Sequence, residues 1–182
     1  MKGVVFTEFL EMVEERFSDE MADRIIEDSD LSSQGAYTSL GTYDHQELIQ
    51  LVVNLSGQTG ISVPELVQAF GEHLFQRFVQ SFPQFFENTH HTFDFLKNLE
   101  GYIHMEVRKL YPDAELPQFT YDIPKPDTLV MNYRSSRPFG DLAEGLIRGC
   151  IEHFGNRIEM VRENLSAEAR TNVRFVLTEV SL

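Results

Sequence analysis

The sequence predicts an α+β fold in which an N-terminal helical part packs on a C-terminal antiparallel sheet with one inserted helix. Apolar residues recur at helical spacing over the first two-thirds of the 182 residues. After Pro112 they instead fall into short segments with the composition and alternation of strands. The chain shows no internal repeat or low-complexity tract, so we expect one domain over residues 1–182.

Local start and stop signals place the first helices. A helix is predicted over residues 4–17, where glutamates fill most positions between the apolar ones. Ser18 is a typical capping residue and opens a second helix, and the polar segment 29–43, broken by two glycines, is predicted as a loop. Asp44 and Glu47 favour a capping box for a third helix, which two further glycines end.

The strongest helix signal lies in the middle of the chain. Ser62 opens this helix, with a proline in the first turn and a glutamate three residues later, and Pro83 ends it. Short helical turns around residues 84–88 and from Thr92 lead into a further helical segment, 99–111.

The C-terminal part predicts four strands and one helix. Segments 117–123 and 127–134 are rich in strand-forming residues and are joined by a proline-containing turn. A helix over residues 141–154 separates them from strands over 157–164 and 171–180. We expect these strands to form a meander-like sheet.

The charge balance excludes some partners. The chain carries 15 Lys and Arg against 29 Asp and Glu, a formal net charge of −14. An acidic surface repels phosphate groups, and no strongly basic face is evident, since residues 134–137, for example, hold only two cations. Nucleic acids and anionic membranes are therefore disfavoured as partners. With 42% hydrophobic residues the chain can form a core and is not disordered.

A single cysteine and the lack of long apolar runs set further limits. Cys150 alone cannot form an internal disulfide or a cysteine-based zinc site. No signal peptide and no run of about 20 apolar residues is present, so we expect a soluble, cytoplasmic protein.

Phenylalanine is unusually abundant in one part of the chain. Eight of the fifteen Phe residues lie within residues 70–95, and the chain has no Trp. Such a cluster suits an ordinary aromatic core, but it also suits a wall around a large flat ligand. Composition alone leaves both interpretations open.

Of the six histidines, His104 has the most informative setting. It lies just after Gly101, at the border of the apolar stripe of its helix, and no histidine falls within a local metal-binding pattern such as H-E-x-x-H. A border histidine can be a hydrogen-bonded structural residue. It can also be an axial ligand, whose neutral imidazole presents a nitrogen to iron.

The segment Tyr133-x-Ser135-x-Arg137 leaves a predicted strand and enters a loop. In extended backbone these alternate positions project to one side. Two hydroxyls and a guanidinium on one side suit a carboxylate, which arginine binds with two charge-assisted hydrogen bonds. Routine contacts at a strand end are the alternative.

Taken together, these segments resemble the heme nitric oxide/oxygen binding (H-NOX) family, of the stand-alone bacterial type. The resemblance covers essentially the whole chain, and the Tyr-x-Ser-x-Arg element is its most specific part. The other segments that carry it are Met1-Lys2-Gly3, Ala69-Phe70-Gly71, His104-x-x-x-x-Lys109-Leu-Tyr111-Pro112 and Leu116-Pro117.

The resemblance implies a heme b group (iron protoporphyrin IX), buried between the helical part and the sheet. His104 matches the proximal histidine that ligates the iron. Tyr133, Ser135 and Arg137 match the triad that binds the heme propionates, and Pro117 matches a proline that presses on the porphyrin and distorts it.

The resemblance also indicates which gas binds. Members that hold oxygen carry a distal tyrosine at the position that Leu142 occupies here. Val5, Phe9, Leu74 and Leu146 are expected to line the same face, and none of these residues donates a side-chain hydrogen bond. We therefore expect a nitric oxide sensor that excludes oxygen and that also binds carbon monoxide.

The expected mechanism is a two-state switch and not an enzymatic reaction. Nitric oxide weakens the iron–His104 bond, and the helix that carries His104 then shifts. Because the sensor fold occupies all 182 residues, the output is expected in a separate protein. By analogy with the family, that partner is a histidine kinase or an enzyme of cyclic-di-GMP synthesis or degradation.

Three alternatives remain at this stage: a heme enzyme, an oxygen-binding heme protein, and a heme-independent protein-interaction module. A heme enzyme would need a distal acid–base group or a thiolate ligand, which Leu142 and its neighbours do not offer. An excursion of His73 or Tyr102 into the pocket would change its gas selectivity, and the sequence leaves this possibility open.

Overall fold

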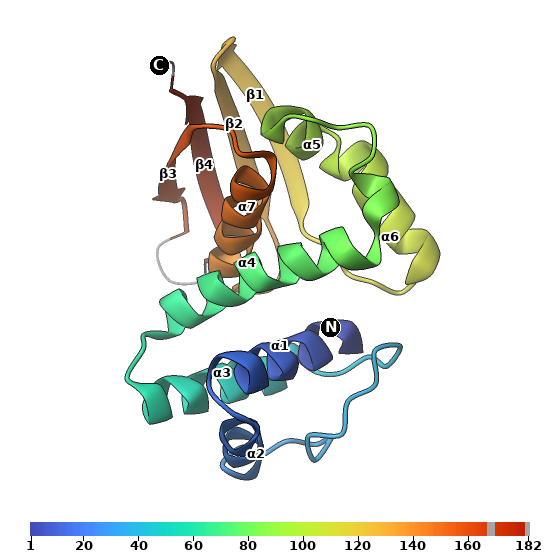
Figure 1. Ribbon diagram of the computed structural model, residues 1–182, viewed down its shortest axis with the longest axis vertical. Coiled ribbons are helices and arrows are strands. Elements are labelled where there is room, and N and C mark those ends of the chain that lie inside the picture. Colours follow the sequence, from blue (N-terminus) through green and yellow to red (C-terminus); the bar gives the residue numbers. More distant parts are fainter. Residues whose placement is uncertain (167–169, 181–182) are drawn as a thin grey trace.

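The helices and the sheet occupy the parts of the chain that the sequence predicts, which confirms the α+β class (Figure 1). The computed structural model describes residues 1–166 and 170–180, so the last two residues of the predicted 1–182 domain lie outside it. Its helices are α1 (Gly3–Arg16), α2 (Asp19–Glu27), α3 (His45–Thr59), α4 (Val63–Ser81), η1 (Pro83–Phe85), α5 (Thr92–Lys97), the π-helical turn η2 (Leu99–Ile103), α6 (His104–Leu110) and α7 (Gly140–Phe154). Its strands are β1 (Gln118–Lys125), β2 (Thr128–Arg134), β3 (Ile158–Asn164) and β4 (Asn172–Glu179).

The sheet is antiparallel throughout, but it is not the predicted meander. Its strand order is β1-β2-β4-β3, so β4 lies between β2 and β3. The connection from β2 passes through α7 to β3, which lies two positions from β2 at the edge of the sheet. The β1–β2 pairing continues to Lys125, with an irregularity after Asp122 where Pro124 has no N–H for the ladder.

The predicted helix caps are present for two helices. The Ser18 hydroxyl accepts a hydrogen bond from the Met21 N–H at the start of α2. At the start of α4, Ser62 and Glu65 form the reciprocal capping box. Local sequence signals sufficed here because both partners lie within one turn.

The predicted capping box of α3 does not form. Asp44 caps the helix by accepting from the Gln46 N–H, but the buried Glu47 carboxylate turns away. It accepts hydrogen bonds from the hydroxyls of Ser33 and Tyr37 and so holds the 29–43 loop. The helix continues through Gly57, which was predicted to end it together with Gly60, and stops at Gly60 with φ of 75°.

Helix α4 runs between the two halves of the molecule (Figure 1). One hydrophobic cluster joins α1–α3 to one side of α4, and a second joins α4, α7 and the inner face of the sheet. Leu146 of α7 packs against both clusters. The position of α7 relative to α4 therefore sets how the two halves meet.

Glycines allow α4 and α7 to approach at backbone distance. A Cβ atom on Gly71 of α4 would lie 2.6 Å from the carbonyl oxygen of Leu142, and one on Gly145 of α7 would lie 2.1 Å from that of Gln68. No side chain fits at these distances, so only glycine permits this crossing. The same contact fixes where the neighbouring residues of α7 point.

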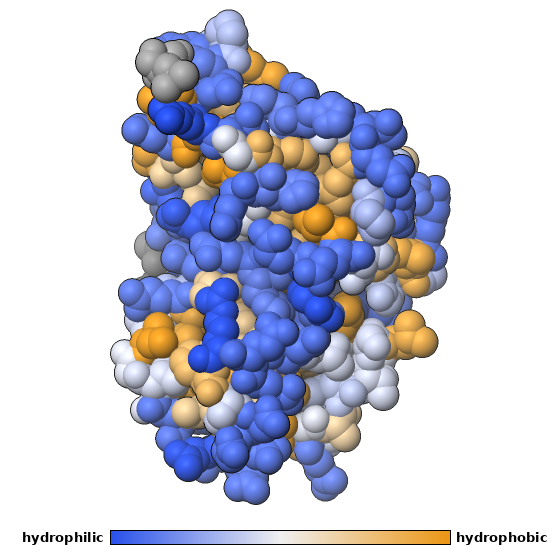
Figure 2. All heavy atoms as spheres, viewed as in Figure 1, coloured by the Kyte–Doolittle hydropathy of each residue, from blue (hydrophilic) through white to orange (hydrophobic). Residues whose placement is uncertain are grey.

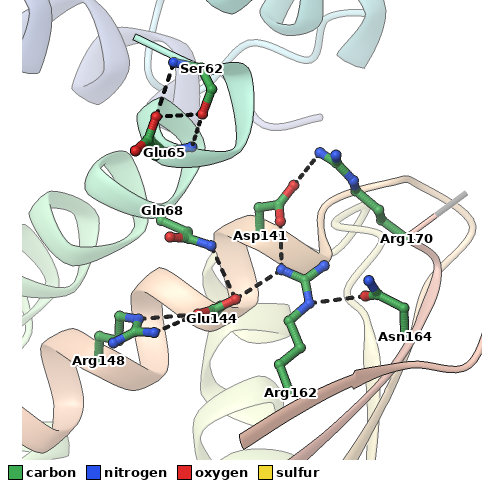
Figure 3. Close-up of polar contacts among 9 residues, drawn as sticks. All are labelled: Ser62, Glu65, Gln68, Asp141, Glu144, Arg148, Arg162, Asn164 and Arg170. Carbon is green, nitrogen blue, oxygen red and sulfur yellow. Dashed lines mark hydrogen bonds and ion pairs between the residues drawn. The ribbon is translucent and has the colours of Figure 1, made fainter. Parts of the chain in front are cut away.

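Polar contacts secure the N-terminal end of α7 on both sides (Figure 3). The carboxylates of Asp141 and Glu144 are buried, and Arg162 of β3 donates to both. Arg170 pairs with Asp141, and the amide of Gln68 on α4 donates to Glu144 over 3.1 Å. Because these charges are paired inside the protein, they add little to the acidic exterior.

The surface drawn in Figure 2 is mainly hydrophilic, and hydrophobic residues show on it only in separate groups. In the described ranges, no helix combines the length and the apolarity that crossing a bilayer requires.

Alanine substitutions at two helical glycines, one at the close crossing and one away from it, should have opposite effects on stability. Gly145→Ala places a methyl group against the α4 backbone and should lower the free energy of unfolding by about 1–3 kcal/mol. Gly57→Ala, inside α3 with open space around it, should raise that free energy by about 0.5–1 kcal/mol. Urea denaturation followed by circular dichroism measures both, and a Gly145→Ala variant as stable as wild type would contradict the crossing.

Candidate functional site

A cavity with a volume of about 360 Å³ lies between the helical part and the sheet. Its walls are mostly apolar, as in sites for small molecules and cofactors. Residues from α1, α4, α6, α7 and the sheet contribute. Six of the eight clustered phenylalanines line it, which favours the wall interpretation of this cluster: Phe75, Phe78, Phe82, Phe85, Phe86 and Phe95.

His104 lies on the cavity wall at the start of α6 and is only 7% exposed. Its Nδ1 is 3.1 Å from Glu100 Oε1, and the same oxygen accepts the Phe119 N–H over 2.9 Å. Because a carboxylate only accepts, Nδ1 carries the proton and Nε2 keeps its lone pair. Burial lowers the pKa of His104, against the opposing effect of Glu100, and so favours the neutral imidazole.

Tyr133, Ser135 and Arg137 all line the cavity, although strand alternation does not bring them together as predicted. The strand ends at Arg134 and the chain then bends, with Ser135 Oγ accepting the Arg137 N–H over 3.1 Å. Burial raises the pKa of the Tyr133 phenol, which therefore keeps its proton. The bend places two hydroxyls and a guanidinium at one edge of the cavity.

Arg137 already holds a carboxylate at this edge. Its Nη2 donates to Glu115 Oε2 over 2.6 Å, and Ser136 donates to the other oxygen of Glu115. These contacts lower the pKa of Glu115, with the Ser136 hydrogen bond as the largest cause. The group around Arg137 is thus suited to bind a carboxylate.

Part of the cavity wall is aliphatic. Val5, Leu74, Leu142 and Leu146 contribute to it, and the two leucines of α7 are one helical turn apart. Phe9 was also expected on this wall but does not line the cavity. Its ring is fully buried in the α1–α4 core, because it turns towards Phe70 instead; the ring centroids are 5.2 Å apart.

Pro117 lines the cavity, whereas His73 and Tyr102 are not among its lining residues. His73 lies between α1 and α4, with its ring nitrogens 3.9 Å from carboxylate oxygens of Glu8 and Glu15. Tyr102 is 43% exposed and packs on Phe85. Neither side chain therefore enters the cavity in the structure.

Sequence reasoning did not single out Glu100, Glu115 and Lys2. Glu100 could have been found, because it precedes His104 by four residues and such pairs meet on a helix. Lys2 and Glu115 also line the cavity. Lys2 pairs with Asp113 and Glu115 pairs with Arg137, and in both cases the partner is distant in the sequence. No local pattern indicates contacts of this kind.

The residues present fit a heme group. Within residues 1–166 and 170–180, no group of three or more His, Cys, Asp or Glu side chains could hold a metal ion. A metal at His104 would therefore need further ligands, which a porphyrin supplies. The aromatic and aliphatic walls suit its flat apolar body, and the group around Arg137 suits its carboxylates.

Comparison with known families decides the classification. The family model described as haem-NO-binding matches residues 2–162. The chain belongs to this family. Members of the haem-NO-binding family are heme-binding gas-sensor domains, and the H-NOX resemblance of the sequence is confirmed.

Solved structures agree with this membership. The Fe(II) unliganded H-NOX protein from K. algicida is 40% identical, with a TM-score of 0.93, 100% of this chain covered and 98% of that chain. The H-NOX protein of Shewanella woodyi, solved with IWP-051 in the Fe(II)CO state, is 42% identical, with a TM-score of 0.84 and coverages of 99% and 95%. An S. oneidensis H-NOX protein in the Fe(II)NO state shares the fold, at 22% identity, a TM-score of 0.91 and full coverage of both chains. No curated protein sequence matches the chain.

Two neighbouring arginines allow the carboxylate site to be tested. Arg137→Ala should release heme about ten- to a hundredfold faster, since a hydrogen bond to a charged group contributes about 1.5–3 kcal/mol. Arg134→Ala, at the exposed strand end outside the cavity, should leave the rate unchanged. Heme transfer to excess apomyoglobin measures both rates. Equal rates for the two variants would contradict a role of Arg137 in binding heme.

Proposed function

We propose that residues 1–182 form a nitric oxide sensor that carries heme b, excludes oxygen and regulates a separate signalling protein. The observation that carries the proposal is the contrast between two groups of residues that line the cavity. His104 lines it with Nδ1 hydrogen-bonded to Glu100, whereas Val5, Leu74, Leu142 and Leu146 line it with aliphatic side chains that donate no hydrogen bond.

A heme held by His104 and the group around Arg137 would supply an iron that binds diatomic gases. The protein determines what surrounds the gas. Oxygen on ferrous iron gains negative charge and is held by a hydrogen-bond donor, whereas nitric oxide binds tightly without one. The missing donor is worth about 1.5–3 kcal/mol, a ten- to hundredfold weaker hold on oxygen.

The signal starts at His104. His104 would hold the heme, binding of nitric oxide would release it, and the helical segment η2–α6 would then be free to shift. Three features support this step: the histidine begins α6, a π-helical turn directly precedes it, and Pro117 lies on the same cavity. A ligand can bias a protein only through such differential contacts with two states.

We further propose that the output partner is a histidine kinase or an enzyme of cyclic-di-GMP turnover in the cytoplasm, and that carbon monoxide also binds. The formal charge of −14 favours a basic docking surface on the partner. The sensor itself performs no catalysis in this scheme. Each step is binding, release or displacement of a side chain or helix.

Absorption spectra of the ferrous protein in air test the oxygen exclusion. We expect no stable oxygen complex for wild type and a stable one for Leu142→Tyr, because the added hydroxyl can donate to bound oxygen. Leu142→Phe is the matched control, since it adds the ring without the hydroxyl and should remain free of oxygen. A stable oxygen-bound spectrum of wild type would instead favour an oxygen-binding protein.

The His104 step is tested by separating the imidazole from its helix. In His104→Gly supplemented with imidazole, heme should remain bound and nitric oxide should give the same five-coordinate spectrum as in wild type. The output of the partner should nevertheless no longer respond to nitric oxide, because the released imidazole is not attached to α6. Partner activity is measured with and without nitric oxide. A preserved response would contradict the proposal that release of His104 moves α6.

A further inference from the structure

Glu100 connects three parts of the molecule through one carboxylate oxygen. Its Oε1 lies 3.1 Å from Nδ1 of His104 and 2.9 Å from the backbone nitrogen of Phe119 in β1. The Glu100 side chain is 29% exposed, and that of His104 only 10%. The hydrogen bond between them is therefore largely shielded from competition with water.

The backbone around Glu100 departs from a regular α-helix. The N–H of Ile103 bonds the carbonyl of Asn98, and the N–H of His104 bonds that of Leu99, each five residues back. The sequence predicts a helical segment over 99–111, and the π-helical turn within it is a finding of the structure. Such turns occur frequently at functional sites, where they re-orient side chains.

We propose that Glu100 is the positioning residue of His104. It fixes the proton on Nδ1, orients the ring so that Nε2 faces the cavity, and increases the electron-donating strength of Nε2. Histidine ligands of metals commonly donate their second N–H to a carboxylate or carbonyl in this way. This role rests on the proposed ligation of heme iron by His104.

The hydrogen bond from the Phe119 N–H also connects Glu100 to the sheet. Because the same oxygen accepts from Phe119, displacement of His104 is transmitted to the first residues of β1. Pro117 and Phe119 both line the cavity and flank Gln118, where β1 begins. Glu100 thereby connects His104 and helix α6 with strand β1.

The distinguishing experiment uses purified heme-loaded protein with Glu100→Gln and Glu100→Ala. Glutamine retains an oxygen that can accept from Phe119 but lacks the charge, so it separates positioning of the backbone from electron donation. The matched control is Glu106→Gln, which removes a carboxylate of α6 that pairs with Lys109.

The midpoint potential, the iron–histidine band in resonance Raman spectra and the exchange rate of the Phe119 amide are measured. We expect both variants to favour ferrous over ferric heme about tenfold more than wild type, which is about 59 mV for one electron. The iron–histidine band should move to lower frequency. The Phe119 amide should exchange faster in Glu100→Ala but stay protected in Glu100→Gln, and Glu106→Gln should change none of the three.

An unchanged potential and an unchanged Raman band in Glu100→Gln, at wild-type heme content, would overturn the role of Glu100. This decision does not require Glu100→Ala to fold. If wild type itself shows no iron–histidine band that disappears in His104→Gly, the ligation by His104 is wrong, and the role of Glu100 is overturned with it. The two failures are therefore distinguishable.

Discussion

The backbone contact between α4 and α7 is the constraint on which the cavity depends. Gly71 and Gly145 bring the two helices too close for any side chain between them. The cavity-facing residues Leu142 and Leu146 flank Gly145 on α7, so their positions follow from this crossing. On the sheet side, Cys150 of the same helix packs in the second hydrophobic cluster. One helix thus defines a wall of the cavity, the junction with α4 and the cover of the sheet.

The extent to which the fold could be predicted follows the range of the interactions. Ser62 and Glu65 lie within one helical turn, and their capping box could be read directly from the sequence. The same pattern at Asp44 and Glu47 gave a wrong prediction of a capping box, because the hydroxyls of Tyr37 and Ser33 in the preceding loop donate to the glutamate. The strand order was missed for a similar reason. Each strand was recognisable from its composition, but the pairing of β2 with β4 joins segments that a whole helix separates.

In the site, too, local patterns were predictable from the sequence and contacts between distant segments were not. Spacing and residue type indicated His104 and the segment from Tyr133 to Arg137, and the structure brings them to one cavity. The family resemblance placed Phe9 on the same cavity face as Val5, four residues earlier. However, the apolar face of α1 is wide enough for one residue to face the cavity and the other the core. Contacts such as that of Glu115 with Arg137 join segments distant in the chain, so no pattern in the sequence could indicate them.

In the proposed sensor, the aliphatic residues of the cavity and His104 have different roles. Leu74, Leu142 and Leu146 would offer a bound gas only dispersion contacts, which differ little between oxygen and nitric oxide because the two are similar in size. Discrimination would then come from the strength of the iron–gas bond itself. The hydrogen bonds of Glu100 reach both His104 and the backbone of β1. A change in the bond between His104 and iron would therefore alter polar contacts that extend to the sheet. In the proposed sensor, the information about which gas is bound thus leaves the cavity through its proximal wall.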